Sequence, residues 1–223
     1  MASSRIAILR RLLLGLLAVA VTGCATINPY LPSFLRSPGS KKAVKMRSIA
    51  ILPFAYRSEE VRRTCDVCPN PLIMTETSEE SALLVTAFFY EALSRYPRFE
   101  IVPFETVSAY AADSMDEQLA QLTRDHRIDG VVVGGVLEMR ERLGDPRHPT
   151  RTGGAAIYAA MLDVGSGEAI WAQYFDGTEY PPGFAYKTYK RLVDTVDERR
   201  PTAAEVAEYA VDRMVKSMSK SVK

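Results

Sequence analysis

Two apolar segments joined by a glycine-rich turn restrict the fold of this chain more than any other feature. Ala155–Val164 and Ala169–Tyr180 flank Gly165-Ser166-Gly167, a combination typical of two antiparallel strands joined by a tight turn. The alternation predicts that Ile157, Ala159 and Met161 face away from Tyr158, Ala160 and Leu162, and that Trp171 and Phe175 face away from Ile170, Ala172 and Tyr174. The chain is therefore expected to close a β-sheet with an antiparallel hairpin.

Apolar strands and helical segments alternate before the hairpin. Strands are predicted over Arg47–Tyr56, Arg98–Phe104 and Ile128–Arg142. Helices are predicted from the capping box Thr77-Ser78-Glu79-Glu80 to about Tyr96, near Thr106–Ala112, and over about Asp116–His126. The apolar stripe of the first helix consists of Leu84, Phe88 and Ala92, with Ala87 and Phe89 beside them. Strands that alternate with helices imply right-handed crossovers and a parallel start to the sheet.

A second capping box begins the last helix. Thr202-Ala203-Ala204-Glu205 follows Pro201, and five residues are expected to face the core, namely Val206, Ala207, Ala210, Met214 and Met218. The predicted fold class is α/β: a mixed β-sheet with a parallel start and an antiparallel closing hairpin, flanked by helices, with a C-terminal helix. We place the α/β domain at 47–180, and an aromatic, proline-rich segment with the last helix at 181–223.

The N-terminal segment resembles the signal peptide of a bacterial lipoprotein. Arg5, Arg10 and Arg11 precede the apolar run Leu12–Val21, which is too short for an ordinary transmembrane helix. The run ends in Val21-Thr22-Gly23-Cys24, which resembles a lipobox, the motif whose cysteine thiol receives lipid such as palmitate. The alternatives are a plain signal peptide with a chance cysteine, or a short buried helix.

Export with a lipid anchor defines further expectations. Residues 1–23 are expected to be removed, Cys24 to be lipidated, and 24–46 to form a tether with several prolines. Ala25, in place of the Asp that retains many lipoproteins in the inner membrane, favours the outer membrane, facing the periplasm. Removal of the three arginines takes the net charge from +1 to −2, which gives the chain no general attraction to nucleic acid.

Cys65 and Cys68 lie in a long polar loop, Arg57–Glu76, and loops of this length are often functional. A metal site needs further ligands, but the chain has only two histidines, both far downstream. Haem attachment needs histidine where Pro69 stands, and a thioredoxin-like site needs the motif to open a helix after a strand. We favour a disulfide that staples the loop, with redox and metal roles as alternatives.

The sequence carries no recognisable catalytic motif. Gly134-Gly135 lies within a predicted strand, without the spacing of a nucleotide-binding loop. Glycines in such a place more often mark a bulge or a close backbone approach. GxSxG and HExxH are absent. We therefore expect no catalytic residues, no bound metal and no cofactor.

Aromatic residues gather after the hairpin, at Tyr180, Phe184, Tyr186 and Tyr189. Tyrosine and phenylalanine supply contact area at low entropic cost. This stretch is expected either to fold back on the sheet or to form a surface for a protein partner.

Four segments carry a resemblance to a known superfamily. They are Ile49–Phe54, Arg98–Phe104, Ile128–Arg142 and Met161–Ala172 (MLDVGSGEAIWA), in that order. Their order and spacing resemble the superfamily of the TolB amino-terminal domain, the penicillin-binding-protein activator lipoproteins and the curli secretion channel lipoprotein, over roughly 47–175. The resemblance implies a fold and no catalytic residues, and it gives only Cys24 a chemically defined role.

The favoured hypothesis is a non-enzymatic lipoprotein that binds another envelope protein, such as a cell-wall synthase or a secretion or assembly machine. The alternative is a ring-forming component of an export complex, which would make the chain a homo-oligomer. A CxxC thiol-redox protein is less favoured. The anchor would hold each of these at the membrane.

Overall fold

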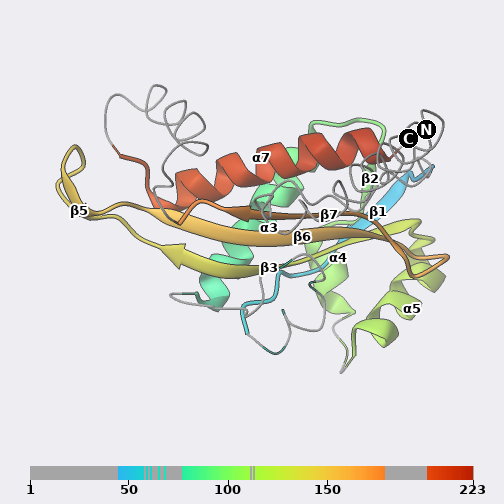
Figure 1. Cartoon of the computed structure of the whole chain (residues 1–223). Coiled ribbons are helices and arrows are strands. Elements are labelled where there is room, and N and C mark those ends of the chain that lie inside the picture. The colour runs from blue at the N-terminus through green and yellow to red at the C-terminus, as the bar shows by residue number, and fades with distance from the viewer. Residues whose placement is uncertain are drawn as a thin grey trace, which may run out of the picture.

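A five-stranded mixed sheet organises the protein (Figure 1). The computed structural model describes residues 45–57, 59, 61, 65, 68, 77–110, 112, 114–178 and 200–222. The strand order is β2 (Glu100–Ile101), β1 (Ser48–Ile51), β3 (Gly130–Arg140), β6 (Gly154–Asp163) and β7 (Ala169–Asp176). β1 pairs in parallel with β2 and β3, whereas β6 pairs antiparallel with β3 and β7. The predicted fold class is therefore confirmed.

Helices cover both faces of the sheet. α3 (Glu79–Ser94) and α7 (Ala203–Ser221) pack on one face, and α7 runs along the long strands while α3 crosses them (Figure 1). α4 (Phe104–Ala109) and α5 (Met115–His126) pack on the other. Within the described residues, no helix combines the length and the apolar character needed to cross a membrane.

Buried side chains form one cluster on each face of the sheet. The inner cluster joins the sheet to α3 and α7 and includes Ile49, Ile51, Val85, Phe89, Ile157, Trp171, Met214 and Met218. The outer cluster includes Ala50, Leu52, Val107, Leu122, Val131, Val133, Tyr158 and Tyr174. β1 contributes alternate residues to both clusters, as expected for a strand covered on two faces.

The closing hairpin has the predicted faces with one exception. Ile157, Ala159 and Met161 belong to the inner cluster, whereas Tyr158 and Ala160 belong to the outer one. Ile170 was expected on the outer face but packs against the inner cluster. The pairing shifts there, because Met161 pairs with Trp171 while Leu162 pairs with Ala169. One extra residue in β7 turns Ile170 to the other face.

Two predictions for α3 were wrong in detail. The N-cap is Ser78, whose side chain accepts a hydrogen bond from Ser81 N–H at 3.2 Å, and Thr77 instead donates its hydroxyl to Val136 O at 3.3 Å. The predicted stripe is also rotated. Ala87 is exposed, and the buried residues are Ala82, Val85, Thr86, Phe89, Ala92 and Leu93.

A small hairpin occupies the predicted turn-rich link between β3 and β6. β4 (Leu143–Gly144) and β5 (Pro149–Arg151) pair antiparallel, and this arm projects beyond the end of the main sheet (Figure 1). Asp145 accepts hydrogen bonds from the backbone N–H groups of Arg147 and His148, at 2.8 and 3.1 Å, and these bonds order the turn of the arm.

The core extends beyond the predicted domain limits. Met46, which was placed in the tether, is 4% exposed and packs in the inner cluster. α7, which was placed in a separate C-terminal segment, supplies Val206, Ala207, Ala210, Met214 and Met218 to the same cluster. The last helix and the sheet therefore form one folding unit. Residues 1–44, most of 58–76, and 179–199 lie outside the described part of the chain.

Candidate functional site

The cysteine loop rests on the outer face of β3. Val61 is fully buried, and its N–H donates to Arg57 O at 3.1 Å while Cys65 N–H donates to Val61 O at 3.0 Å. Both bonds span four residues, which is the spacing of hydrogen bonds in an α-helix. Gly135 makes room for the loop, because a Cβ at Gly135 would lie 2.7 Å from Val61 Cγ2. The close approach predicted for the two glycines is found here.

Cys65 and Cys68 form a disulfide, with their Cα atoms 5.6 Å apart. Both residues are partly buried and pack against the outer cluster. Each sulfur is therefore bonded to the other, so that neither offers a thiolate for metal binding or for nucleophilic attack in this state. The bond closes a short ring in the chain next to the point where Val61 is anchored.

Gly134 has a different neighbour, on the inner face. A Cβ at this position would lie 2.2 Å from Phe54 Cε1 and 2.5 Å from Tyr158 O. The segment after β1 is tied to the same place, since Ala55 N–H donates to Gly134 O and Val136 N–H donates to Ala55 O, both at 2.9 Å. The glycine pair thus serves packing between strands, and no phosphate-binding loop is formed.

The other predicted site residues lie outside the described residues. These are Cys24 and the aromatic residues Tyr180, Phe184, Tyr186 and Tyr189. The described ends of the aromatic segment are nevertheless close in the fold. Arg140 donates a hydrogen bond to Thr178 O, and Arg142 donates one to Arg200 O. The chain therefore leaves and re-enters the described domain beside the end of β3.

A polar group that sequence reasoning missed lies at this same end of the sheet. Arg140 pairs with Glu138 at 3.0 Å, and Tyr174 donates its hydroxyl to Asp176 Oδ2 at 3.3 Å. Burial, helped by the carboxylates of Asp176 and Glu138, raises the pKa of Tyr174 well above its usual value. Tyr174 is thus a neutral donor at physiological pH. The sequence did contain a signal for the Tyr174–Asp176 contact, because residues two apart in a strand share a face.

The two histidines are separated in the fold. His126 Nε2 lies 3.2 Å from Tyr110 Oη, and their rings meet edge to face, whereas His148 lies in the β4–β5 arm. In the part of the chain that the structure describes, no group of three or more His, Cys, Asp or Glu is placed to hold a metal ion. The described surface includes a stapled loop on one face and a projecting arm at one end.

No family model and no curated protein matches the chain. Its fold is similar to that of PelC from Paraburkholderia phytofirmans, solved as a dodecamer, with TM-score 0.46 and 10% identity over 81% of this chain and 93% of that chain. The lipoprotein GNA1162 from Neisseria meningitidis matches with TM-score 0.38 and 16% identity over 67% and 97%. The LpoB C-terminal domain from Salmonella enterica matches with TM-score 0.38 and 10% identity over 63% and 88%.

Identities of this size concern the fold alone, and the function of this chain has to be argued from its own residues.

Proposed function

We propose that this protein is a lipid-anchored component of the outer membrane that faces the periplasm and binds another envelope protein without catalysing a reaction. The Cys65–Cys68 disulfide carries the proposal. Disulfides persist in exported proteins and are rare in the reducing cytosol. Export is also what the lipobox-like segment ending at Cys24 predicts. Two features far apart in the sequence thus favour the same compartment.

The cysteine loop is the favoured contact surface. It is fixed at two points, by Val61 under the loop and by the disulfide beyond it. A loop held on a rigid scaffold loses little conformational entropy when it meets a partner. The aromatic segment around Tyr186 is the second proposed surface. Confinement by a lipid anchor and tether would raise the effective concentration of either surface toward a partner in the same envelope.

The test has two parts that fail independently. Metabolic labelling with palmitate should mark the wild-type chain and leave Cys24→Ala unlabelled, and labelling of Cys24→Ala would overturn the anchor. Photo-crosslinking residues placed at Val67 or Tyr186 in cells should capture one envelope protein. The same group at Glu208, which is exposed on α7 across the sheet, should not. Equal capture from all three positions would overturn the proposed surfaces.

A homo-oligomer, such as a ring in an export complex, is the second candidate. The observation that favours it is the β4–β5 arm, whose Leu143 is 59% exposed and is the most exposed large apolar side chain in the described residues. An exposed apolar residue on a projecting hairpin suits contact with a neighbouring copy. The mass of the detergent-extracted lipoprotein separates the two candidates. A monomer would exclude the ring, and a uniform assembly that Leu143→Asp dissociates would favour it.

A thiol-redox role needs a reactive disulfide. Titration of free thiols after mild reduction distinguishes this role from a structural staple. Rapid re-formation of the Cys65–Cys68 bond, with two electrons passing from the two thiols to a disulfide substrate, would favour the redox role. Slow oxidation that needs no such substrate would favour the staple.

A further inference from the structure

The exposed side of α3 includes apolar residues as well as acidic ones. Leu83 is 43% exposed and Ala87 is exposed, and Leu84 and Phe88 beside them are only half-buried. Residues three and four apart lie on the same side of a helix, so these four form one stripe, the α3 stripe. Apolar side chains gathered on an exposed side of a helix often mark a contact surface.

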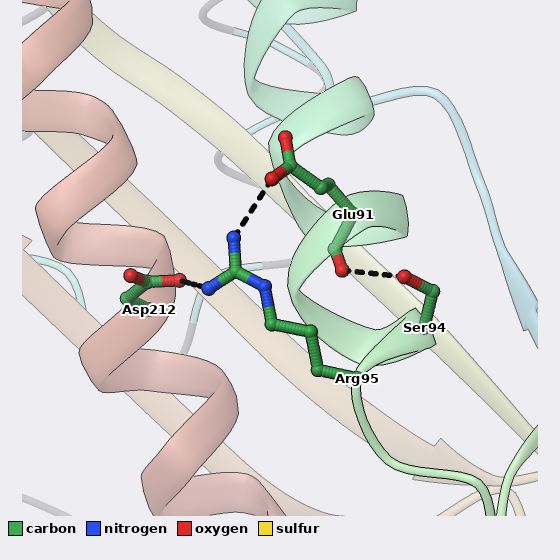
Figure 2. Close-up of polar contacts among 4 residues, drawn as sticks. All are labelled: Glu91, Ser94, Arg95 and Asp212. Carbon is green, nitrogen blue, oxygen red and sulfur yellow. Dashed lines mark hydrogen bonds and ion pairs between the residues drawn. The ribbon is translucent and has the colours of Figure 1, made fainter.

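Leu84 and Phe88 pack in part against the inner cluster, and the ion pairs that fix the orientation of α3 lie outside the α3 stripe. Figure 2 shows Arg95 between the two helices, with Nη1 bonded to Asp212 Oδ1 at 3.0 Å and Nη2 bonded to Glu91 Oε1 at 2.8 Å. The guanidinium balances the charge of Glu91 and ties the end of α3 to α7. Glu79 and Glu80, in the first turn, have no ion pair within the described residues. The α3 stripe is therefore bordered by unbalanced negative charge at its N-terminal end.

The segment before the first described residue has complementary chemistry. Tyr30, Leu31, Phe34 and Leu35 repeat the spacing of the four residues of the α3 stripe. Between Ala25 and Lys45 the sequence contains four cations, Arg36, Lys41, Lys42 and Lys45, and no acidic residue. Apolar groups followed by positive charge match an apolar stripe bordered by negative charge.

The chain is long enough to make this contact within one molecule. Glu100 N–H donates to Arg47 O at 2.8 Å, so the chain enters the sheet beside a residue six positions after the end of α3. Six extended residues span at most about 21 Å, and seven helical residues back to Ala87 add about 10 Å. The twelve residues between Phe34 and Met46 reach about 40 Å when extended, which exceeds that separation.

We propose that residues 30–42 of the same chain dock on the α3 stripe, with the aromatic and leucine side chains of the segment on Leu83, Leu84, Ala87 and Phe88, and its cations near Glu79 and Glu80. Docking shortens the connection between the domain and the N-terminal end of the chain, and it competes with any other protein for the stripe. The inference goes beyond the proposed function and does not depend on the partner's identity.

Crosslinking in the full lipidated chain, purified in mild detergent, tests the contact. Phe34→Cys combined with Ala87→Cys should give an intrachain crosslink with a short bis-maleimide, identified by peptide mass. The control is Phe34→Cys combined with Glu117→Cys, because Glu117 is exposed on α5, across the sheet from α3. An interchain product alone would assign the stripe to a second copy and overturn the proposal. Equal yields from the two pairs, or no product, would overturn it as well.

Charge reversal supplies a second measurement. Glu80→Lys should lower the yield of the 34–87 crosslink about twofold to fivefold, as expected for loss of an exposed ion pair. Glu208→Lys on α7 should leave the yield unchanged. Both positions are exposed, so both variants are expected to fold. A crosslink that responds equally to the two reversals, or to neither, would contradict the role assigned to the acidic end of α3.

Discussion

Gly134 is the residue where one added methyl group meets the most obstruction. In Gly134→Ala the new Cβ would lie 2.2 Å from the Phe54 ring and 2.5 Å from a backbone oxygen, Tyr158 O. The Phe54 ring is also held against Phe89, with ring centroids 4.8 Å apart. Overpacking of this kind costs about 1–3 kcal/mol of unfolding free energy.

Urea unfolding measures that cost. Gly165→Ala is the matched control, because its Cβ would meet only the flexible Asp163 carboxylate, at 3.3 Å. The urea concentration at the midpoint of unfolding should be clearly lower for Gly134→Ala than for Gly165→Ala. Identical midpoints would contradict the close packing of Phe54 and Tyr158 against Gly134.

Asp145 governs the order of the β4–β5 arm. The backbone N–H groups of Arg147 and His148 hold the pKa of the Asp145 carboxyl below its usual value. A carboxyl whose pKa is lowered by folding contributes order above its unfolded pKa and loses it as pH falls through the folded pKa. The protection factors of the 147 and 148 amides, which compare their exchange with that of an unfolded chain at the same pH, should therefore be high at neutral pH and lower in acid.

Asp145→Ala should show low protection factors at every pH, and Asp145→Asn, which keeps an acceptor oxygen, should retain protection in acid. High protection in Asp145→Ala would show that strand pairing alone orders the turn.

Some contacts of individual residues were predictable from the sequence, and others were not. The glycine pair predicted a close approach, and the approach is present. Its partners, Phe54 and Val61, come from more than 70 residues earlier in the chain, and no local pattern identifies them. The Tyr174–Asp176 bond was visible as spacing along one strand, whereas the Arg140 contact with Thr178 depends on how three strands align.

At the level of the helix, Ser78 rather than Thr77 caps α3. Ser78→Ala should lower the free energy of unfolding by about 1 kcal/mol, because the Ser81 N–H loses its acceptor. Ser78→Asp should keep most of the stability, since a carboxylate accepts the same bond and favours the positive end of the helix. Chemical unfolding of the three proteins measures this. A larger loss in Ser78→Asp than in Ser78→Ala would contradict the assigned cap.

The two capping predictions differed in outcome for a physical reason. Thr202 and Glu205 bond reciprocally, as the local sequence predicts. Thr77 has the same local signal, but its hydroxyl is used by Val136 O of β3. A tertiary contact competes with the local bond and moves the helix start by one residue. The displaced Ile170 is a similar case, because a single extra residue reverses the face of a strand residue.

For the whole molecule, the structure predicts one cooperative unit. Met214 is fully buried between α7 and the sheet. Met214→Ala should reduce the free energy of unfolding by about 3 kcal/mol and leave a single transition. Met115→Ala on the exposed side of α5 should change little. Unfolding is monitored by far-UV circular dichroism, which reports helix content, and by Trp171 fluorescence. A separate early transition for α7 would indicate an independent C-terminal segment.

The extent of the buried core was hard to predict from composition. Met46 follows a proline- and serine-containing stretch and reads as part of it, but its side chain fills the space above Gly130. Composition describes a segment by its average, whereas burial is decided residue by residue. The mixed sheet was predictable because its strands carry strong apolar patterns, and the small β4–β5 arm was not because its strands are two and three residues long.

The chain enters the sheet at one end of β3, and the β4–β5 arm leaves at the other. Ile49 pairs with Gly130, and Arg140 pairs with Gly154, and the eleven residues of β3 span about 36 Å. Under the proposed anchor at Cys24, the pole with the turn between β6 and β7 would be proximal to the membrane, and the pole with the arm would be distal. The height of a partner above the membrane would then decide which pole it meets.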